Sequence, residues 1–445
     1  MTPRLWGRRN LNDQGRGQMR LTKRHFLAGA AAACAMPYVA GRAFAQGKQL
    51  NVFAHRVLQN VSNGTAGGDV TAGFTEANGA SINWATFETG PLHDRVFREA
   101  SLDQSTVDVA FLLNTYATPR VTALFEPLDA YMKSAPLENF DDIFPGLVKA
   151  VTFDGRLFAV PFRHASTGLH YNQEIFAECG ISGPPKTIEE FIDIAKRCTK
   201  KRPNGTPAVG FILPGVAYPE VIAFARAWDA DFITPDMKVV ANSEPMVKAL
   251  TAIRQLYEAG AVPRNLAGMK AEDANTWMQT GRAAMAMSSM SRHGLYNDPK
   301  KSQAAGKIKT TFFPIAEALR GKYDVAPAKV EFWSMAIPKN AQNKDLAWKF
   351  IKWMSSPQAT LGAALNGNGP VRNSTYDDPR IIEALPYAQD ERRVLAVSRV
   401  PLPAFNEAAR AADFFKEEAE AAVLGMKTPQ QAMDDLTVRV QALLK

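Results

Sequence analysis

The chain has 445 residues, of which 46% are hydrophobic and 22% charged, and its formal net charge is +8 at pH 7. This is the composition of a globular protein, and the length suffices for two or three domains. After residue 45, no apolar run approaches the roughly 20 residues that a membrane-spanning helix needs, which excludes a multi-span membrane protein.

The start of the chain reads as an export signal. Three basic residues precede a weakly apolar stretch and a site of A-x-A type: Arg20, Lys23 and Arg24, then residues 26–40, then Ala43-Phe-Ala45. This order predicts a signal peptide over residues 1–45, cleaved after Ala45. We therefore expect a periplasmic protein.

Three details of this segment leave its processing open. Residues 22–27 resemble a twin-arginine signal with Lys23 in place of the first arginine, so both the general secretory and the twin-arginine routes fit. Met19 directly precedes the basic residues and is a candidate for the true start. Cys34 follows alanines and lacks the leucine of a lipoprotein site, so release is favoured over lipid anchoring.

Removal of the signal changes the charge balance and the cysteine count. The mature chain retains 44 basic and 43 acidic residues, and this balance predicts no general affinity for nucleic acid or anionic lipid. Two cysteines remain, Cys179 and Cys198, each near the expected end of one of two successive helices. Two buried free thiols are favoured over a disulfide, and pairing stays open.

The first part of the mature chain alternates strands with helices. Apolar alternation predicts strands at 49–54, 81–86 and 107–113, with helices near 69–78 and 92–101 between them. Such alternation indicates an α/β fold with parallel strands. In these sheets ligands bind beyond the carboxyl ends of the strands. The loops at these ends carry His55, Arg56, Glu88, Asn114 and Tyr116.

The remainder of the chain mixes turns with longer helices. Asp154-Gly155 between apolar runs predicts a hairpin. We expect helices near 173–179, 187–200 and 345–354, a mainly helical region over 243–290 that ends in a strand at 283–287, and a helical tail from residue 406 interrupted near Gly425 and Pro429.

An ordered series of short motifs carries a resemblance to a known family. It comprises Asp108-Val-Ala-Phe, Leu124-Phe-Glu-Pro-Leu-Asp129, Asp154-Gly-Arg-Leu-Phe-Ala-Val-Pro161, Gly168-Leu-His-Tyr-Asn172 with Phe176, Pro185-Lys-Thr-Ile-Glu-Glu-Phe191, Gly281-Arg-Ala-Ala-Met-Ala-Met287, Ala336-Ile-Pro-Lys-Asn340, Ala347-Trp-Lys-Phe-Ile-Lys-Trp353 with Ser356-Pro357, and Gly369-Pro-Val-Arg372 with Tyr376-Asp-Asp-Pro379. In this order the chain resembles the extracellular solute-binding proteins of ABC importers, in the branch that contains maltose- and other carbohydrate-binding proteins.

The resemblance implies the type II periplasmic binding protein fold, in which two discontinuous α/β lobes enclose a ligand cleft. By analogy, one lobe takes residues 46–163 and 308–353, and the other takes 164–307 and 354–445. The lobes would close on a sugar-like solute by hinge bending. The implied partners are an ABC permease and its ATPase subunits, and the protein would act as a monomer without a cofactor or a bound metal.

Sugars and polyols require hydrogen-bonding groups and aromatic rings that cover their apolar faces. Trp333 is the leading stacking candidate, since the family places ligand contacts just before its Ala-Ile-Pro-Lys segment; a packed tryptophan is the alternative. Trp228 and Asp229 lie where relatives carry ligand contacts. Glu331 would bind hydroxyls or pair with an arginine. Trp84, Trp277, Trp348 and Trp353 are expected to be packing residues.

Basic residues at other expected cleft positions leave the charge of the ligand open. The first crossover between the lobes carries Arg163, His164 and Thr167, where many relatives have Asp- and Thr-rich contacts, and Arg292 and Arg372 also lie in loops. Several arginines together favour an acidic ligand, such as a sugar acid or a sugar phosphate, because guanidinium binds these groups through two hydrogen bonds.

The sequence contains no motif of an established catalytic class. We find no H-E-x-x-H, C-x-x-C, G-x-S-x-G or phosphate-binding loop. A secreted hydrolase of carbohydrates with paired carboxylates remains an alternative, because spacing alone does not exclude it. A receptor-type adaptor that signals to a membrane sensor would use the same fold.

Overall fold

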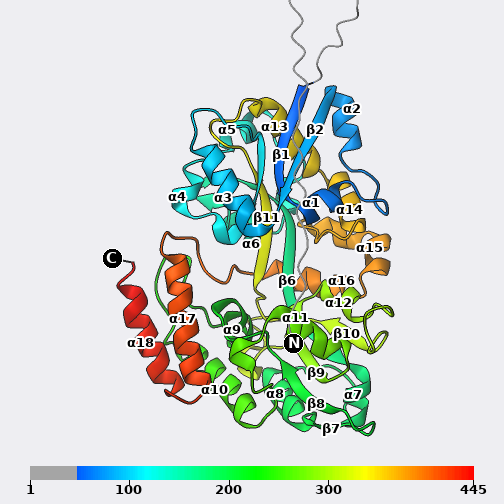
Figure 1. Cartoon of the computed structure of the whole chain (residues 1–445), viewed down its shortest axis with the longest axis vertical. Coiled ribbons are helices and arrows are strands. Elements are labelled where there is room, and N and C mark those ends of the chain that lie inside the picture. The colour runs from blue at the N-terminus through cyan, green and yellow to red at the C-terminus, as the bar shows by residue number, and fades with distance from the viewer. Residues whose placement is uncertain (1–47, 445) are drawn as a thin grey trace, which may run out of the picture. The chain divides into compact units, whose positions relative to one another are not determined.

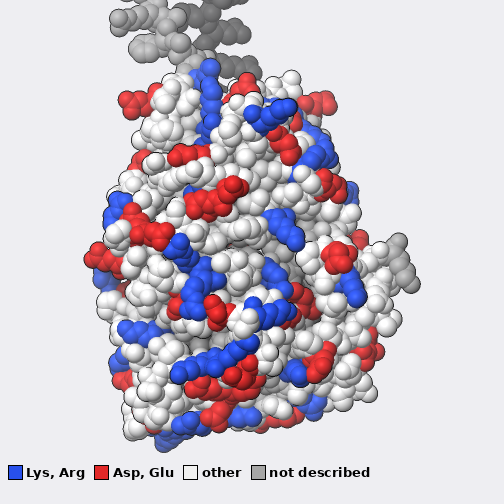
Figure 2. Space-filling model, turned by 180° about the vertical axis from the view of Figure 1, so that it is seen from behind, with Lys and Arg blue, Asp and Glu red and all other residues white. Residues whose placement is uncertain are grey.

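The computed structural model describes residues 48–444 of the chain. The expected signal peptide, Met19 and Cys34 lie outside the described residues. Within them, no helix combines the length and the apolar character needed to cross a membrane. On the face that Figure 2 shows, basic and acidic residues are interspersed, in agreement with the balanced charge of the mature chain.

A nine-stranded sheet runs through the molecule in the order β2-β1-β3-β11-β6-β9-β8-β7, with β10 paired to β6 (Figure 1). Its strands are β1 Lys48–His55, β2 Ala80–Phe87, β3 Val109–Leu113, β6 Val160–Asn172, β7 Lys200–Lys201, β8 Pro207–Ile212, β9 Ala283–Ser289, β10 Ile308–Thr311 and β11 Val330–Ala336. β1 is parallel to β2 and β3, whereas β11 is antiparallel to β3 and β6.

The helices surround this sheet. In chain order they are α1 Arg56–Ser62, α2 Ala72–Asn78, α3 Thr89–Ala100, α4 Pro119–Thr122, α5 Asp129–Ser134, α6 Pro145–Lys149, α7 Gln173–Glu178, α8 Ile188–Arg197, α9 Tyr218–Ala225, α10 Glu244–Glu258, α11 Ala271–Gln279, α12 Arg292–Tyr296, α13 Lys344–Met354, α14 Pro357–Leu365, α15 Pro379–Ala384, α16 Ala388–Ala396, α17 Ala408–Val423 and α18 Pro429–Gln441. Short 3₁₀ turns lie at Asn114–Tyr116 (η1), Phe140–Asp142 (η2), Arg226–Trp228 (η3), Leu266–Gly268 (η4), Glu317–Leu319 (η5) and Asn373–Asp377 (η6).

Two large hydrophobic cores form on this frame. The first contains buried residues of β1, β3, the start of β6, β11 and α13, such as Val52, Phe111 and Phe350. The second contains residues of α8, α9, α10, α17 and α18, such as Phe191 and Phe224. In Figure 1 these elements occupy the upper and the lower part of the described chain, respectively.

The 13-residue strand β6 connects the two cores. Its first half, Val160–Ser166, pairs with β11, and its second half, from Thr167 onward, pairs with β9 and β10. The chain passes between the cores again through residues 312–329 and 397–405. Val325 and Ala328 of the first of these segments form a small buried cluster with Val394 of α16. Three connections therefore cross the junction.

The main elements expected from the sequence are confirmed within two to four residues at most ends. The hairpin at Asp154-Gly155 joins β4 Thr152–Phe153 to β5 Arg156–Leu157, with both turn residues at positive φ (49° and 74°) as a tight two-residue turn requires. Cys179 and Cys198 follow the last residues of α7 and α8. Both are free, with Cys198 buried and Cys179 half-buried.

One segment packs differently from the lobe division implied by the family resemblance. Residues of α14, α15 and α16, including Ala363, Ile381 and Leu395, belong to the first core, although the analogy placed everything after residue 353 in the second lobe. From the C-terminal part, the second core contains Phe405 and residues of α17 and α18. The lobe boundaries thus stay a prediction, and we propose that the C-terminal passage between lobes lies near residues 397–405.

Candidate functional site

Aromatic side chains gather where the strands of the first core end. In Figure 1, β1 and β2 run from the upper end of the molecule toward its middle. Trp333 of β11 lies there, with its ring centroid 5.7 Å from that of His55 at the end of β1 and 5.6 Å from that of His93 on α3. Tyr116 stacks on His93 at 3.9 Å and 12°. Together these rings form an aromatic group at the carboxyl ends of the strands.

Hydrogen bonds hold the imidazoles of this group in place. Nε2 of His93 accepts a hydrogen bond from the backbone N–H of Leu113 (3.0 Å), and its Nδ1 lies 2.6 Å from the carbonyl oxygen of Thr89. Burial lowers the pKa of His93 to about 4, against the opposing effects of the Thr89 carbonyl and Asp94. His93 is therefore neutral at physiological pH and acts as a flat, rigid support for Trp333 and Tyr116.

An exposed carboxylate borders the aromatic group. Glu88 precedes α3 and its side chain is 77% exposed, with Oε2 lying 3.4 Å from Nε2 of His55. Nδ1 of His55 accepts a hydrogen bond from the backbone N–H of Val57 (3.2 Å) at the start of α1. Glu88 and His55 are thus a polar edge beside the indole of Trp333, the combination that a hydroxylated ligand requires.

A second polar group lies at the start of β11, the strand that carries Trp333. Nζ of Lys329 is 3.7 Å from Oε1 of Glu331 on β11 and 3.7 Å from Oε1 of Glu220 on α9. Tyr218, also on α9, is near enough to both carboxylates for their charges to raise the pKa of its phenol, although its burial is the larger cause. These residues link the first core to the second at the junction.

Other side chains expected in the site are engaged within the protein. Oδ1 of Asn114 accepts from the backbone N–H of Phe332 (2.9 Å), which fixes β11 beside β3. His164 is buried with Nε2 3.0 Å from the hydroxyl of Tyr376, and burial lowers its pKa to about 3. Thr167 is buried, and its backbone N–H donates to the carbonyl oxygen of Lys329 (3.1 Å).

The basic residues that suggested an acidic ligand are dispersed. Arg372 is fully buried and donates to three carbonyl oxygens, those of Ser355, Asn139 and Glu138, at 2.6–2.8 Å. Nη1 of Arg163 points to Gly367 and Asn368, at 3.4 and 3.3 Å. Arg56 and Arg292 are exposed at the first residues of α1 and α12. The structure therefore does not bring these arginines together as one anion-binding cluster.

The Trp228-Asp229 pair belongs to a network at the crossover. Trp228 is half-buried against Phe224, with ring centroids 5.7 Å apart. Asp229 binds Lys322 (2.5 Å) and Arg399 (2.8 Å), and these two cations outweigh its burial and lower the pKa of its carboxyl. Both side chains therefore serve the packing of the second core and its connection to residues 322 and 399.

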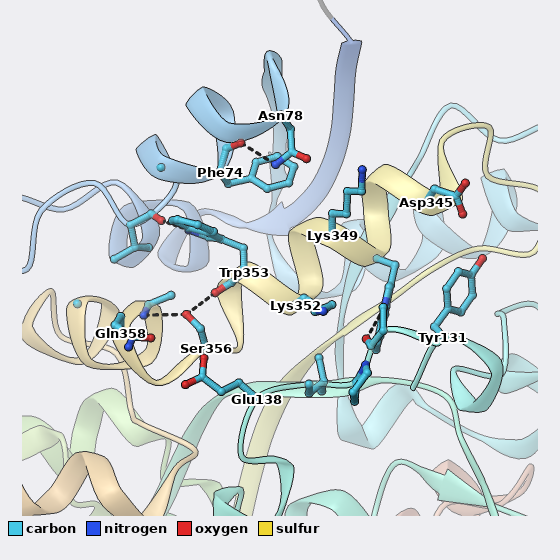
Figure 3. Close-up of a pocket in the computed structure, with 18 of the residues that line it drawn as sticks. Phe74, Asn78, Tyr131, Glu138, Asp345, Lys349, Lys352, Trp353, Ser356 and Gln358 are labelled. Atoms are coloured by element: carbon cyan, nitrogen blue, oxygen red, sulfur yellow. Dashed lines mark hydrogen bonds between the residues drawn. The ribbon is translucent and has the colours of Figure 1, made fainter. Parts of the chain in front are cut away.

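A separate pocket of about 1080 Å³ opens among α2, α5, α13 and α14 (Figure 3). Phe74, Tyr131, Glu138, Lys349 and Trp353 are among the residues that line it. None of the residues that line it belongs to the aromatic group of His55, His93, Tyr116 and Trp333. This pocket is therefore distinct from the aromatic group. Trp353, expected to be a packing residue, is 38% exposed here.

The described residues contain no group of three or more His, Cys, Asp or Glu side chains arranged to hold a metal ion.

Comparison with known proteins decides the family. Residues 61–361 match the model of the bacterial extracellular solute-binding proteins. The chain belongs to this family.

This solute-binding protein is similar to other binding proteins, in one case over nearly its whole length. It is 25% identical to a probable amino-acid ABC transporter periplasmic-binding protein of Sinorhizobium fredii, covering 96% of this chain and 98% of the relative. It is 24% identical to the erythritol/L-threitol-binding protein of Mycolicibacterium smegmatis, covering 68% and 67% of the two chains. The protein is thus the substrate-binding component of an ABC transporter.

The structural comparison agrees on the fold. The sugar-binding protein MalE of Xanthomonas citri superposes with a TM-score of 0.76 at 21% identity, covering 89% of this chain and 97% of MalE. The two-lobed, type II periplasmic binding protein fold expected from the motif series is confirmed.

Of the residues that the sequence predicted for the site, the structure brings His55, Tyr116 and Trp333 into one aromatic group with Glu88 beside His55, and it places Glu331 beside Lys329. Their role in binding stays a prediction. Sequence reasoning missed four residues, namely His93, Tyr218, Glu220 and Lys329. One of them had a signal, because side chains two residues apart on a strand share a face, and counting back from Trp333 gives Glu331 and Lys329. The other three come from helices and carry no such periodic signal.

Proposed function

We propose that this protein captures a sugar or a polyol in the periplasm and delivers it to the permease and ATPase subunits of an ABC importer. The observation that carries the proposal is the placement of Trp333 over His93, beside His55 and Glu88, at the strand ends. Aromatic faces cover the C–H surfaces of a sugar, and the adjacent polar groups bind its hydroxyls.

In this proposal the solute lies at the junction of the two cores, and the three crossing segments act as the hinge. A ligand that contacts both lobes favours the closed shape, which the permease then recognises. One copy of the chain and no cofactor suffice for such a cycle, and no chemical change of the solute is required. The name of the M. smegmatis relative, which refers to erythritol and L-threitol, supports a polyhydroxylated ligand.

Thermal unfolding with a panel of solutes tests the proposal. The mature protein is heated alone and with maltose, D-mannitol, ribitol or erythritol, and in parallel with D-gluconate, sn-glycerol 3-phosphate or an equimolar mixture of amino acids. A ligand at 100 times its dissociation constant stabilises the folded state by about 2.7 kcal/mol. We expect stabilisation by a neutral polyhydroxylated solute, which is recovered unchanged. Stabilisation by amino acids alone, or hydrolysis of the sugar, would contradict the proposal.

A further inference from the structure

Lys329, Glu220 and Glu331 form a group in which the ammonium has two carboxylate neighbours but no short contact with either. The side chain of Lys329 is only 13% exposed, yet its Nζ lies 3.7 Å from both Glu220 and Glu331. Direct hydrogen bonds between charged nitrogen and oxygen atoms span about 2.7–2.9 Å. By contrast, Nζ of Lys344 lies 2.7 Å from Oε1 of Glu126. The ammonium of Lys329 is thus held between two carboxylates without the short contacts that would saturate its donors.

The position of this group connects it to the aromatic site. Val330 and Phe332 are buried in the first core, whereas the alternate residues Glu331 and Trp333 are half-buried, and Trp333 packs against the edge of this core. Lys329 precedes Glu331 by two residues, and its carbonyl oxygen accepts from the backbone N–H of Thr167 on β6. Glu220 approaches from α9, whose buried residues belong to the second core. The group therefore lies where both cores meet, next to Trp333 in the strand.

The chemistry of the group suits adjacent hydroxyls. A hydroxyl both donates and accepts, so it can accept from the ammonium and donate to a carboxylate at the same time. Two such hydroxyls on neighbouring carbons would each bridge Lys329 and one carboxylate from the side, because a separation of 3.7 Å leaves no room for an oxygen atom between the two charged atoms. A site whose buried charged groups form hydrogen bonds with the hydroxyls of a ligand rejects analogues that lack those hydroxyls more strongly than a purely apolar site does.

The charge of the group opposes anions. One ammonium stands against two carboxylates, so the formal sum is negative when both are ionised. A ligand carboxylate or phosphate would meet this excess in a partly buried environment, where like charges repel strongly. Burial raises the pKa of Glu220, while Lys329 opposes that effect.

We propose that Lys329, Glu220 and Glu331 form the hydroxyl-binding group that selects neutral solutes with adjacent hydroxyls and excludes carboxylates and phosphates. This inference rests on the proposed function, because it assigns selectivity to the same site. It identifies Lys329 as the residue whose removal costs affinity, and the two glutamates as the residues whose neutralisation widens the ligand range.

Calorimetric titration of the mature protein tests this assignment. The probes are ribitol, D-mannitol and maltose as neutral solutes, with D-gluconate and sn-glycerol 3-phosphate as anions. We expect Lys329→Gln to weaken binding of the neutral solute at least tenfold. The double variant Glu220→Gln/Glu331→Gln, which reverses the formal charge of the group, should gain measurable binding of an anion. Lys344→Gln removes a lysine that forms a direct ion pair with Glu126, apart from the proposed site, and should leave affinity unchanged.

The outcomes separate this inference from the proposed function. If Trp333→Ala loses affinity while Lys329→Gln and the double variant behave as wild type toward all five probes, the assignment is overturned and the proposed function stands. If the wild type binds none of the neutral solutes, both fail. Should Lys329→Gln not fold, Glu331→Gln replaces it, since Glu331 is one-third exposed. Unchanged affinity and unchanged exclusion of anions in that variant would equally overturn the assignment.

Discussion

The rings of Trp333 and His93 lie 5.6 Å apart and 29° from parallel, although they come from β11 and α3. His93 is held by two contacts with backbone atoms, and its ring also stacks on the ring of Tyr116. The indole of Trp333 therefore rests against a rigid support. A support of this kind reduces the conformational entropy that Trp333 loses when a ligand stacks on it.

Removal of the indole should weaken ligand binding without unfolding the protein. Trp333 is half-buried, and Trp333→Ala removes a stacking surface worth about 0.5–1.5 kcal/mol beyond the area it buries. We expect a loss of affinity of tenfold or more in calorimetric titration with the neutral solute that binds best. Trp353→Ala, which removes an exposed tryptophan of the separate pocket, is the matched control and should retain affinity.

Arg372 should be a determinant of stability rather than of ligand charge. Its three hydrogen bonds tie the residue that precedes η6 to carbonyl oxygens of residues 138, 139 and 355. Arg372→Met removes all three hydrogen bonds, including the one to the carbonyl oxygen of the buried Ser355, and a buried polar group that loses its partner costs about 1–3 kcal/mol. We expect a lower midpoint of urea unfolding, together with wild-type affinity in the folded protein. A variant that folds normally but loses its ligand would place Arg372 in the site instead.

We expect Arg226 to contribute more than Arg372 to the free energy of unfolding, because it holds together segments that connect the two cores. It is fully buried, forms a 2.7 Å ion pair with Asp231, and donates to the carbonyl oxygens of Ala328, Arg399 and Val400, which lie on two crossing segments. Breaking a buried pair on one side costs about 3–5 kcal/mol. Arg226→Met should therefore lower the free energy of unfolding by that order, measured by urea denaturation.

A surface pair provides the comparison for Arg226. Lys248 and Glu244 lie one turn apart on α10 with exposed side chains. Lys248→Ala should leave the urea midpoint unchanged, because exposed pairs contribute little. Equal effects of the two substitutions would show that the Arg226 network does not hold the crossing segments.

The buried imidazoles predict an acid-sensitive fold. Burial lowers the pKa of His93 to about 4 and the pKa of His164 and His170 to about 3. Histidines of the unfolded chain titrate near pH 6.5, so between about pH 6.5 and pH 4 the unfolded chain binds more protons than the folded protein. The stability that these residues contribute is complete above pH 6.5 and declines on acidification, by up to about 1.4 kcal/mol per pH unit for each histidine.

Urea unfolding at pH 7, 6 and 5 measures this dependence. His170→Gln, which removes one of the three groups, should show a shallower decline than the wild type. The comparison of slopes isolates the histidine, because Glu391, whose pKa is raised by burial, acts in the opposite direction in both proteins. Identical slopes would contradict the assignment of His170 as a neutral buried residue.

The sequence alone was sufficient for the family and for most elements, because both depend on local patterns. Alternation identified β1 and β2, turn chemistry identified the Asp154-Gly155 hairpin, and the order of the motifs identified the fold. Packing of residues 357–395 was not predictable in this way. The apolar faces of α14 to α16 fit either core, and only the three-dimensional path of the chain assigns them to the first.

For the site, the sequence predicted the residues at strand ends better than those in loops. His55 and Glu88 follow from strand topology, which places carboxyl ends together, whereas Trp333 was predicted from its place before the Ala336-Ile-Pro-Lys339 segment. Arg163, Arg372 and Asp229 have the right chemistry for a ligand, but their partners are carbonyls and ions distant in sequence. Tertiary contacts decide whether such a side chain finds all its hydrogen-bond and ion-pair partners within the protein, so residue type alone does not predict whether it is free to bind a ligand.

The central claim is that the solute lies against Trp333 at the junction of the two cores. A crystal structure of the protein purified from its native host, with its retained solute, tests it most directly. We predict electron density for a neutral polyhydroxylated molecule stacked on Trp333, with hydroxyls near Lys329 and Glu331. Density in the pocket beside Trp353 instead, or a solute at the junction that contacts none of these three residues, would contradict the account.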